Sequence, residues 1–158
     1  MTESAGPDVD PGRLPPARAA ETPPPGYTAM VLSDPFEAYV GPFFERTETA
    51  EDGAERIWLA FRVDERHLNG GGHVHGGMLM TFADAALGTL AWRATGRTPS
   101  VTLSMETEFL KGAGLGDLVE VCPILTRRTR AILFIRATFH VRGEPILHAS
   151  SLWKIIGA

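Results

Sequence analysis

The chain holds a single cysteine, Cys122, so an internal disulfide is excluded and a reducing compartment is the expected setting. No stretch of about 18 or more uninterrupted apolar residues occurs, so we expect no membrane-spanning helix. The first residues lack the basic start and apolar core of a secretory signal, which leaves the cytoplasm as the expected location. A formal net charge of −4 gives no support to a general nucleic-acid-binding role.

Several catalytic motifs are also missing. No Gly-x-Ser-x-Gly sequence occurs, so a serine hydrolase is not expected, and no Gly-Lys-Ser/Thr follows the glycine-rich stretch as a phosphate loop requires. His73 and His75 are closely spaced, but no third ligand accompanies them, so we expect neither a metal site nor a cofactor. Cys122 precedes Pro123 without an obvious histidine partner, which is more typical of a small buried residue than of a nucleophile.

Two parts of different composition follow one another along the chain. Residues 1–26 hold seven of the 12 prolines and almost no large apolar residue. Such a segment buries too little apolar surface to offset the conformational entropy that ordering would cost. We therefore predict a disordered proline-rich tail, with a proline-rich recognition motif as the alternative. Residues 27–158 are predicted to form one domain, long enough to bury a core.

The apolar pattern of residues 27–158 predicts one long helix and about five to six strands. Residues 76–94 are apolar in nearly all directions, which indicates a buried helix. Strands are predicted over residues 57–63, 101–109, 118–125, 131–141 and 146–156, with a charged turn at 48–55 and a helix, alone or running into a strand, at 36–44. Short turns require antiparallel neighbours, and a single buried helix needs a sheet that curves around it. The predicted fold class is therefore α+β.

Asp84 is the only ionisable residue between Gly76 and Trp92 of the predicted helix. Aspartate is unfavourable inside a helix, and its carboxylate is costly in apolar surroundings unless it is paired. It is either a structural residue held by a neighbouring hydroxyl or a functional one. A small, polar helix face surrounds it and predicts either close contact with a partner helix or a cleft; the face consists of Gly77, Thr81, Asp84 and Gly88.

The predicted helix begins with His75-Gly76-Gly77, where the first backbone N–H groups have no intrahelical partner. The helix dipole and the close approach that glycine permits allow such a terminus to bind an anion or a developing oxyanion. Gly77 and Asp84 are seven residues apart, or about 10 Å along the axis, too far to act on one carbonyl carbon. If they cooperate, they must come from two chains of a symmetric dimer with two equivalent sites.

These residues resemble a known family. The pattern Asn69-x5-His75-Gly76-Gly77-x6-Asp84 is similar to that of the PaaI-like hotdog-fold acyl-CoA thioesterases, and the likeness continues through residues 99–110. The resemblance covers about residues 63–116 and implies a hotdog fold, an antiparallel sheet wrapped around one long central helix. It further implies hydrolysis of an acyl-CoA to free acid and CoA by homodimers, usually paired into homotetramers, without a metal.

The resemblance also implies roles for single residues. Asp84 matches the catalytic carboxylate, which attacks the substrate as a nucleophile or activates a water as a general base. Gly76 matches the residue whose backbone N–H polarises the thioester carbonyl. His75 and Asn69 match residues that shape the site, although the Gly70–Gly72 run departs from the family pattern and leaves the placement of Asn69 open. Thr102 stands where the family has a serine or threonine that orients the nucleophile.

Further substrate-binding candidates are Gly77, beside the oxyanion donor, and the basic turn of Arg127, Arg128 and Arg130. That turn is either a solvated hairpin or a contact to the phosphates of coenzyme A, which suit arginine. The alternative function is a non-catalytic acyl-CoA or acyl-carrier binding hotdog protein, although a pure binder has little reason to place a carboxylate at the reaction centre. A hotdog dehydratase would pair an aspartate with a catalytic histidine on another loop, which the sequence does not clearly show.

Overall fold

A computed structural model describes residues 22–31 and 34–157 of the chain. Of the predicted tail, residues 1–26, the part up to residue 21 lies outside the described residues. Within residues 22–26, the Pro24 carbonyl accepts a hydrogen bond from the Tyr27 N–H at 2.9 Å. No helix of the described residues is both long and apolar enough to cross a membrane.

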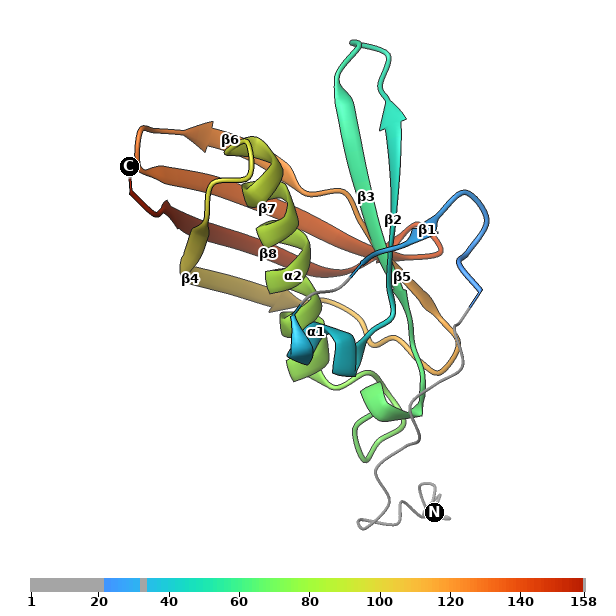
Figure 1. The fold of residues 1–158 in the computed structure, drawn as a ribbon. Helices are drawn as coiled ribbons and strands as arrows, with labels where there is room; N and C mark the ends of the chain where they lie inside the picture. The colour runs from blue at the N-terminus through green and yellow to red at the C-terminus, as the bar shows by residue number, and fades with distance from the viewer. Residues whose placement is uncertain (1–21, 32–33, 158) are drawn as a thin grey trace, which may run out of the picture.

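One antiparallel sheet and one long helix make up most of the described chain (Figure 1). The helices are α1 (Pro35–Val40), the short 3-10 helix η1 (Glu65–His67) and α2 (Gly76–Ala94). The strands are β1 (Thr28–Ala29), β2 (Phe43–Thr49), β3 (Glu55–Arg62), β4 (Ser100–Phe109), β5 (Leu118–Val121), β6 (Ile124–Arg128), β7 (Ile132–Val141) and β8 (Glu144–Ile155). Their order across the sheet is β1-β2-β3-β5-β7-β8-β4, with β6 paired to β7.

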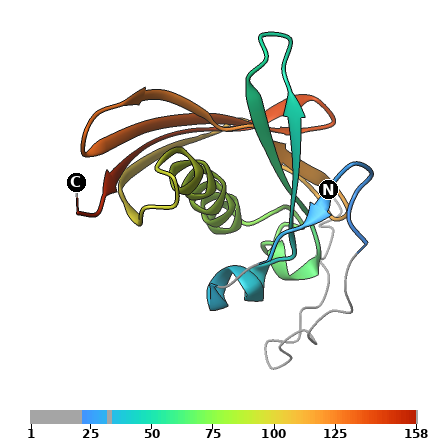
Figure 2. The ribbon, with the colours of Figure 1, turned by 45° about the horizontal axis from the view of Figure 1, so that its top comes forward.

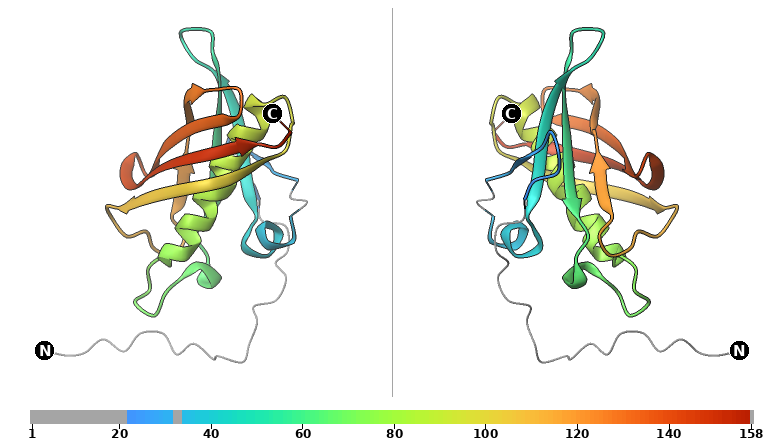
Figure 3. Two further views of the ribbon diagram at one scale, coloured as in Figure 1. Left: turned by 90° about the vertical axis from the view of Figure 1, so that its left-hand side faces the viewer. Right: turned by 90° about the vertical axis from the view of Figure 1, so that its right-hand side faces the viewer.

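The sheet curls around α2, so the predicted α+β hotdog architecture is confirmed. Figures 2 and 3 show the long strands β7 and β8 arching over one side of α2, while α1 lies beside α2 on the side away from these strands. β4 follows α2 in the chain and is the edge strand at one end of the sheet. Among the described strands it pairs only with β8. The edge of β4 therefore carries backbone groups without a strand partner.

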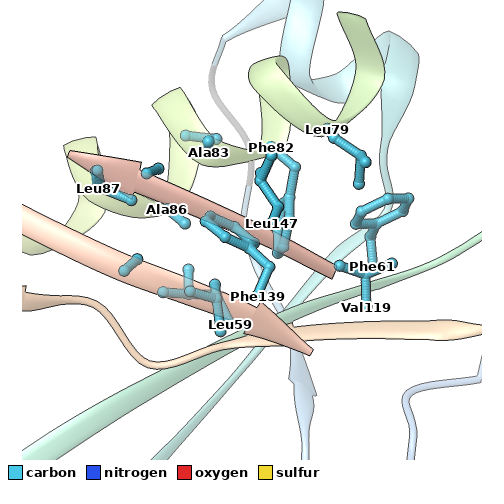
Figure 4. Packing of buried hydrophobic residues seen from close by; sticks show 14 of the residues in the cluster. Leu59, Phe61, Leu79, Phe82, Ala83, Ala86, Leu87, Val119, Phe139 and Leu147 are labelled. Carbon is cyan, nitrogen blue, oxygen red and sulfur yellow. The ribbon is translucent and has the colours of Figure 1, made fainter. Parts of the chain in front are cut away.

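The core lies between α2 and the concave face of the sheet (Figure 4). The fully buried ring of Phe82 on α2 lies at the centre of this core. Its edge-to-face neighbours have ring centroids 4.7 Å away at Phe61, 5.2 Å at Phe43 and 5.8 Å at Phe139. Burying each of these side chains contributes about 1.5–3 kcal/mol, so this cluster is a main reason that α2 stays on the sheet.

The predicted elements agree with the structure, with differences at their ends. The helix over residues 76–94 is confirmed at both ends. The strand predicted over residues 118–125 is two strands, β5 and β6, separated by Cys122 and Pro123, because proline lacks the N–H that a ladder position needs. β2 extends through Thr49, so the charged turn is shorter than predicted. With β1, the sheet has eight strands where five to six were expected.

Helix α2 was predicted to be buried on all sides, and this is wrong for the single chain. Met80 is 41% exposed and Trp92 is 44% exposed, and Asp84 is also exposed. The sheet covers only one side of the helix, so the apolar side chains of the opposite side reach the surface. An exposed apolar face of this kind indicates a contact surface.

Gly88 is a point of very close approach between α2 and β8. A Cβ atom here would lie 2.9 Å from Cη2 of Trp153, whose side chain is only 5% exposed and has no room to withdraw. We expect Gly88→Val to lower the free energy of unfolding by about 2 kcal/mol through overpacking. Thr89→Val, which places the same side chain one position away, is the matched control in a urea titration. Unchanged stability of Gly88→Val would contradict this packing.

Candidate active site

The turn that leads into α2 is organised by Asn69. Its Oδ1 atom accepts hydrogen bonds from the N–H groups of Gly71 at 2.9 Å and His73 at 3.3 Å. Its own backbone N–H donates to the His73 carbonyl at 2.7 Å. The Gly70–Gly72 run, which left the placement of Asn69 open in the sequence, is therefore part of a hydrogen-bonded turn that the amide oxygen of Asn69 holds together.

The first turn of α2 is capped by the side chain of His75. Its Nδ1 atom accepts a hydrogen bond from the Gly77 N–H at 2.9 Å, so a neutral ring carries its proton on Nε2. The N–H groups of Met78 and Leu79 donate to the His75 carbonyl at 2.9 and 3.2 Å. Within the described chain, the Gly76 N–H is the one left without a partner at this helix start. A single free donor therefore stands at the positive end of α2, and Gly77 does not supply a second.

The surroundings of Gly76 explain why glycine occurs here. A Cβ atom at this position would lie 3.3 Å from Cε1 of Phe109, the last residue of β4. The Phe109 ring is 53% exposed, so it flanks the free N–H without covering it fully. The result is a backbone donor beside an aromatic ring at the surface of the single chain.

Asp84 lies on the exposed side of α2, where the Thr102 hydroxyl donates to its Oδ1 atom at 2.7 Å. The prediction that this carboxylate is buried is wrong for the single chain, because the sheet does not reach this side. Thr102 points inward since it pairs with the buried Trp153 of β8, just before a register shift between Thr102 and Ser104. Such irregularities commonly aim side chains at functional sites. The structure thus brings Thr102 and Asp84 together.

Two adjoining hollows, of about 1180 and 340 Å³, meet at Asp84. The larger runs along α2 past Gly88 and Trp92, and the smaller lies between α2 and α1 near Thr81. The polar helix face around Asp84 therefore lines a cleft, which was one of its two predicted roles. Gly77 lines neither hollow.

Glu37 of α1 lines both hollows together with Asp84, and the sequence analysis missed it. Burial raises the pKa of the Glu37 carboxyl, and the negative charges of Asp34 and Asp84 raise it further. In sequence, Glu37 lies in a short segment of apolar residues, Pro35–Val40, and it belongs to no catalytic motif that would distinguish it. Only the packing of α1 beside α2 reveals its place.

Helix α1 is held in position by residues that directly follow β3. The Arg66 guanidinium donates to the carbonyls of Tyr39 and Gly41, both at 2.8 Å, and also pairs with the buried Asp64 at 2.8 Å. The His67 ring is 2.8 Å from the Val40 carbonyl through Nε2. Three consecutive carbonyls at the end of α1 are thus anchored, which fixes Glu37 beside Asp84.

The remaining candidates lie away from Gly76 within one chain. Arg128 donates to the carbonyl of Ala94, the last residue of α2, so the basic turn is beside the opposite helix end. Nineteen residues of helix separate the two ends, about 28 Å. Arg127 lies over the Phe134 ring at 5.9 Å, and Arg130 is exposed in the turn before β7.

His73 and His75 contact different segments of the chain. His73 packs against Gly112, where a Cβ atom would lie 2.8 Å from its Cδ2 atom, whereas His75 caps α2. Among the described residues, no group of three or more His, Cys, Asp or Glu side chains is placed to hold a metal ion. Cys122 is half-buried between β5 and β6, and burial raises the pKa of its thiol.

The raised pKa of Glu37 predicts a pH-dependent stability. Folding disfavours the charged carboxylate, so its cost is present at neutral pH and vanishes in acid, below the ordinary pKa of glutamate. We expect Glu37→Gln to melt at a higher temperature than the parent chain at neutral pH, and the difference to disappear near about pH 4. Melting curves of Glu51→Gln, an exposed turn position, provide the control. A lower melting temperature of Glu37→Gln at neutral pH would refute this assignment.

The chain is similar in sequence to known proteins. Residues 71–146 match the family model described as "Thioesterase superfamily". Over 133 residues the chain is 33% identical to "Putative esterase PA0474" of Pseudomonas aeruginosa, covering 84% of this chain and 96% of that protein. It is 24% identical over 91 residues to mouse "Acyl-coenzyme A thioesterase 13", covering 57% of this chain and 64% of the mouse protein.

Solved structures share the fold. A crystal structure of a variant of the phenylacetic acid degradation protein PaaI from Thermus thermophilus superposes with a TM-score of 0.63 at 24% identity. The match covers 78% of this chain and all of that one, 100%. The family-model match, the identity to the Pseudomonas protein and the sheet wrapped around α2 show that this chain belongs to the thioesterase superfamily and has the hotdog fold of PaaI-like thioesterases.

Proposed function

We propose that this protein is an acyl-CoA thioesterase that hydrolyses an acyl-CoA to free acid and CoA. Asp84 acts as nucleophile or general base, and the Gly76 N–H is the oxyanion donor. The proposal depends on the hydrogen bonding and the exposure of these two groups. The Gly76 N–H has no partner within the described chain, and the Asp84 carboxylate, bound to one hydroxyl, borders a large cleft. The relatives support thioester chemistry, since one is named as an acyl-coenzyme A thioesterase.

The site requires two chains. Gly76 and Asp84 are eight residues apart on α2, about 12 Å along the axis, too far to act on one carbonyl. The edge of β4 has no partner among the described strands, and apolar side chains around it are exposed, including Leu103 at 53% and Val101 at 47%. Antiparallel pairing of two β4 edges about a twofold axis would cover these side chains and run the two α2 helices antiparallel. Gly76 of one chain would then face Asp84 of the other, twice per dimer.

The chemistry follows from the atoms available. The Gly76 N–H of the partner subunit polarises the thioester carbonyl and stabilises the negative charge that develops on its oxygen. Thr102 occupies Oδ1 of Asp84, which leaves Oδ2 free to take a proton from water. That water adds to the carbonyl carbon, the carbon–sulfur bond breaks, and the CoA thiolate leaves and is protonated. In the nucleophilic alternative Oδ2 itself attacks the carbonyl carbon, the carbon–sulfur bond breaks, and the CoA thiolate leaves and is protonated. Water then hydrolyses the resulting anhydride, which releases the acid and restores the Asp84 carboxylate.

The other predicted residues act around this centre. His75 holds the first turn of α2 so that the Gly76 donor stays oriented, and Asn69 shapes the turn before it. Ala94 lies ten residues beyond Asp84 on α2, so in the antiparallel dimer the basic turn is about 15 Å along the axis from the Gly76 that faces Asp84. Arg127, Arg128 and Arg130 are therefore proposed to contact the CoA phosphates at the site of the partner chain.

The base is tested by thiol release from a panel of short, long and aromatic acyl-CoAs. We expect Asp84→Asn to lower kcat by about 10²–10⁴-fold while acyl-CoA still raises the melting temperature. Thr102→Val, which removes only the hydroxyl donor, should cost about tenfold. Full turnover by Asp84→Asn would eliminate the mechanism. Ligand stabilisation without turnover of any acyl-CoA by the parent chain would instead identify a non-catalytic acyl-CoA-binding protein.

The oxyanion donor is tested by a matched pair of substitutions at Gly76. Proline is favoured at the first helical position, and the ψ angle of 134° at His75 is compatible with a following proline. Gly76→Pro removes the N–H, whereas Gly76→Ala keeps it and adds the same Cβ atom next to Phe109. We expect Gly76→Pro to lose about 10²–10³-fold in kcat relative to Gly76→Ala.

Subunit complementation separates a shared site from a site within one chain. Gly76→Pro and Asp84→Asn chains, each inactive alone, are dissociated, mixed and reassociated. If each site combines the two chains, a mixed dimer has one intact site, so about a quarter of the parent activity should return. A mixture that stays inactive while mixed dimers form would show that the two groups do not act across chains.

A further inference from the structure

Glu37 is an unusual carboxylate at this site. It is half-buried, and among the described residues its side chain has no hydrogen bond or ion pair. The nearby charges of Asp34 and Asp84 have the same sign as its own. A charged group held without a partner costs stability, and such groups concentrate at functional sites.

Helix α1 cannot simply turn Glu37 away from the cleft. Its last turn and the following residue are anchored by Arg66 and His67 through the three carbonyls described above. Its first turn is capped by Asp34, whose Oδ1 accepts the N–H groups of Phe36 at 2.8 Å and Glu37 at 3.0 Å. Both ends of the helix are held, so the backbone of Glu37 stays beside the wall that it shares with Asp84.

The charge of the cleft indicates which part of an acyl-CoA lies against Glu37. The larger hollow is lined by five carboxylates and two guanidinium groups, which are Asp34, Glu37, Glu45, Glu55, Asp84, Arg93 and Arg97. Arg93 is already paired with Glu45 at 2.6 Å. The phosphates of coenzyme A would be repelled by the carboxylates around Glu37 and Asp84, so the acyl group is the part that this stretch of the hollow suits.

We propose that Glu37 is a specificity-determining residue that excludes acyl groups ending in an anion, such as dicarboxylic acyl chains, from the cleft beside Asp84. The proposal rests on the proposed thioesterase function and adds its substrate class: neutral acyl chains, or acyl chains that carry a cation. An anionic chain end would meet the like charge of the half-buried Glu37, with the exposed Asp34 nearby.

Binding of two non-hydrolysable thioethers of equal length tests this proposal. S-heptyl-CoA has a neutral end, and S-(5-carboxypentyl)-CoA has a carboxylate at the same distance from sulfur. Isothermal titration calorimetry at neutral pH gives the ratio of their Kd values for the parent chain, Glu37→Gln and the control Glu51→Gln. Because Glu37→Gln is expected to be more stable than the parent chain, unfolding would not account for a changed ratio.

We expect the parent chain and Glu51→Gln to favour the neutral thioether by about tenfold or more. In Glu37→Gln this preference should fall to about twofold or less, mainly through tighter binding of the carboxylate. An equal ratio in the parent chain and Glu37→Gln overturns the proposal, as does a parent chain that binds both thioethers equally or neither. Hydrolysis of heptanoyl-CoA is measured in parallel: its absence, with a ratio that still responds to Glu37→Gln, would reject the thioesterase function and keep the role of Glu37.

Discussion

The contact of the Phe82 ring with three other phenylalanine rings holds α2 against the concave face of the sheet. Much of the remaining architecture depends on this attachment. A helix is a rigid rod, so fixing its centre also fixes the free N–H at its start and the carboxylate two turns later. The same attachment leaves both groups near the side of α2 that the sheet does not cover. The shape of one chain thus keeps donor and carboxylate apart, which is why the proposed chemistry uses a second chain.

Unsatisfied groups are concentrated on that uncovered side. Elsewhere among the described residues, no buried side-chain nitrogen or oxygen lacks a hydrogen-bond partner. On the uncovered side of α2 and at its start, by contrast, the Gly76 N–H has no partner within the described chain, Glu37 faces charges of its own sign, and Met80 exposes an apolar side chain. A fold that satisfies its polar groups so fully elsewhere keeps these exceptions where a substrate or a second chain would meet them.

Local patterns were sufficient for the elements and for part of the site. The apolar run of residues 76–94 predicted α2 to its exact bounds, and the lone Asp84 within it stood out because it breaks two rules at once. The same run led to the wrong prediction that α2 is buried on all sides. An apolar helix face gives the same sequence pattern whether a sheet of its own chain or another chain covers it. The strand predicted over residues 118–125 is instead two strands, β5 and β6, which pair separately with β7.

The sequence by itself determined the helix and most of the strands and singled out Asp84, because periodicity and a lone carboxylate in an apolar run are properties of neighbouring residues. The tertiary structure alone decided that the Gly77 N–H is taken by His75 and that Thr102 reaches Asp84. It also decided that Glu37 shares the cleft. The contact of Thr102 with Asp84 and the place of Glu37 depend on strand register and on the anchoring of α1 by Arg66, and residues so far apart in the chain leave no local pattern that encodes them. The cap on Gly77 is local, but it depends on the side-chain conformation of His75, which the sequence does not specify.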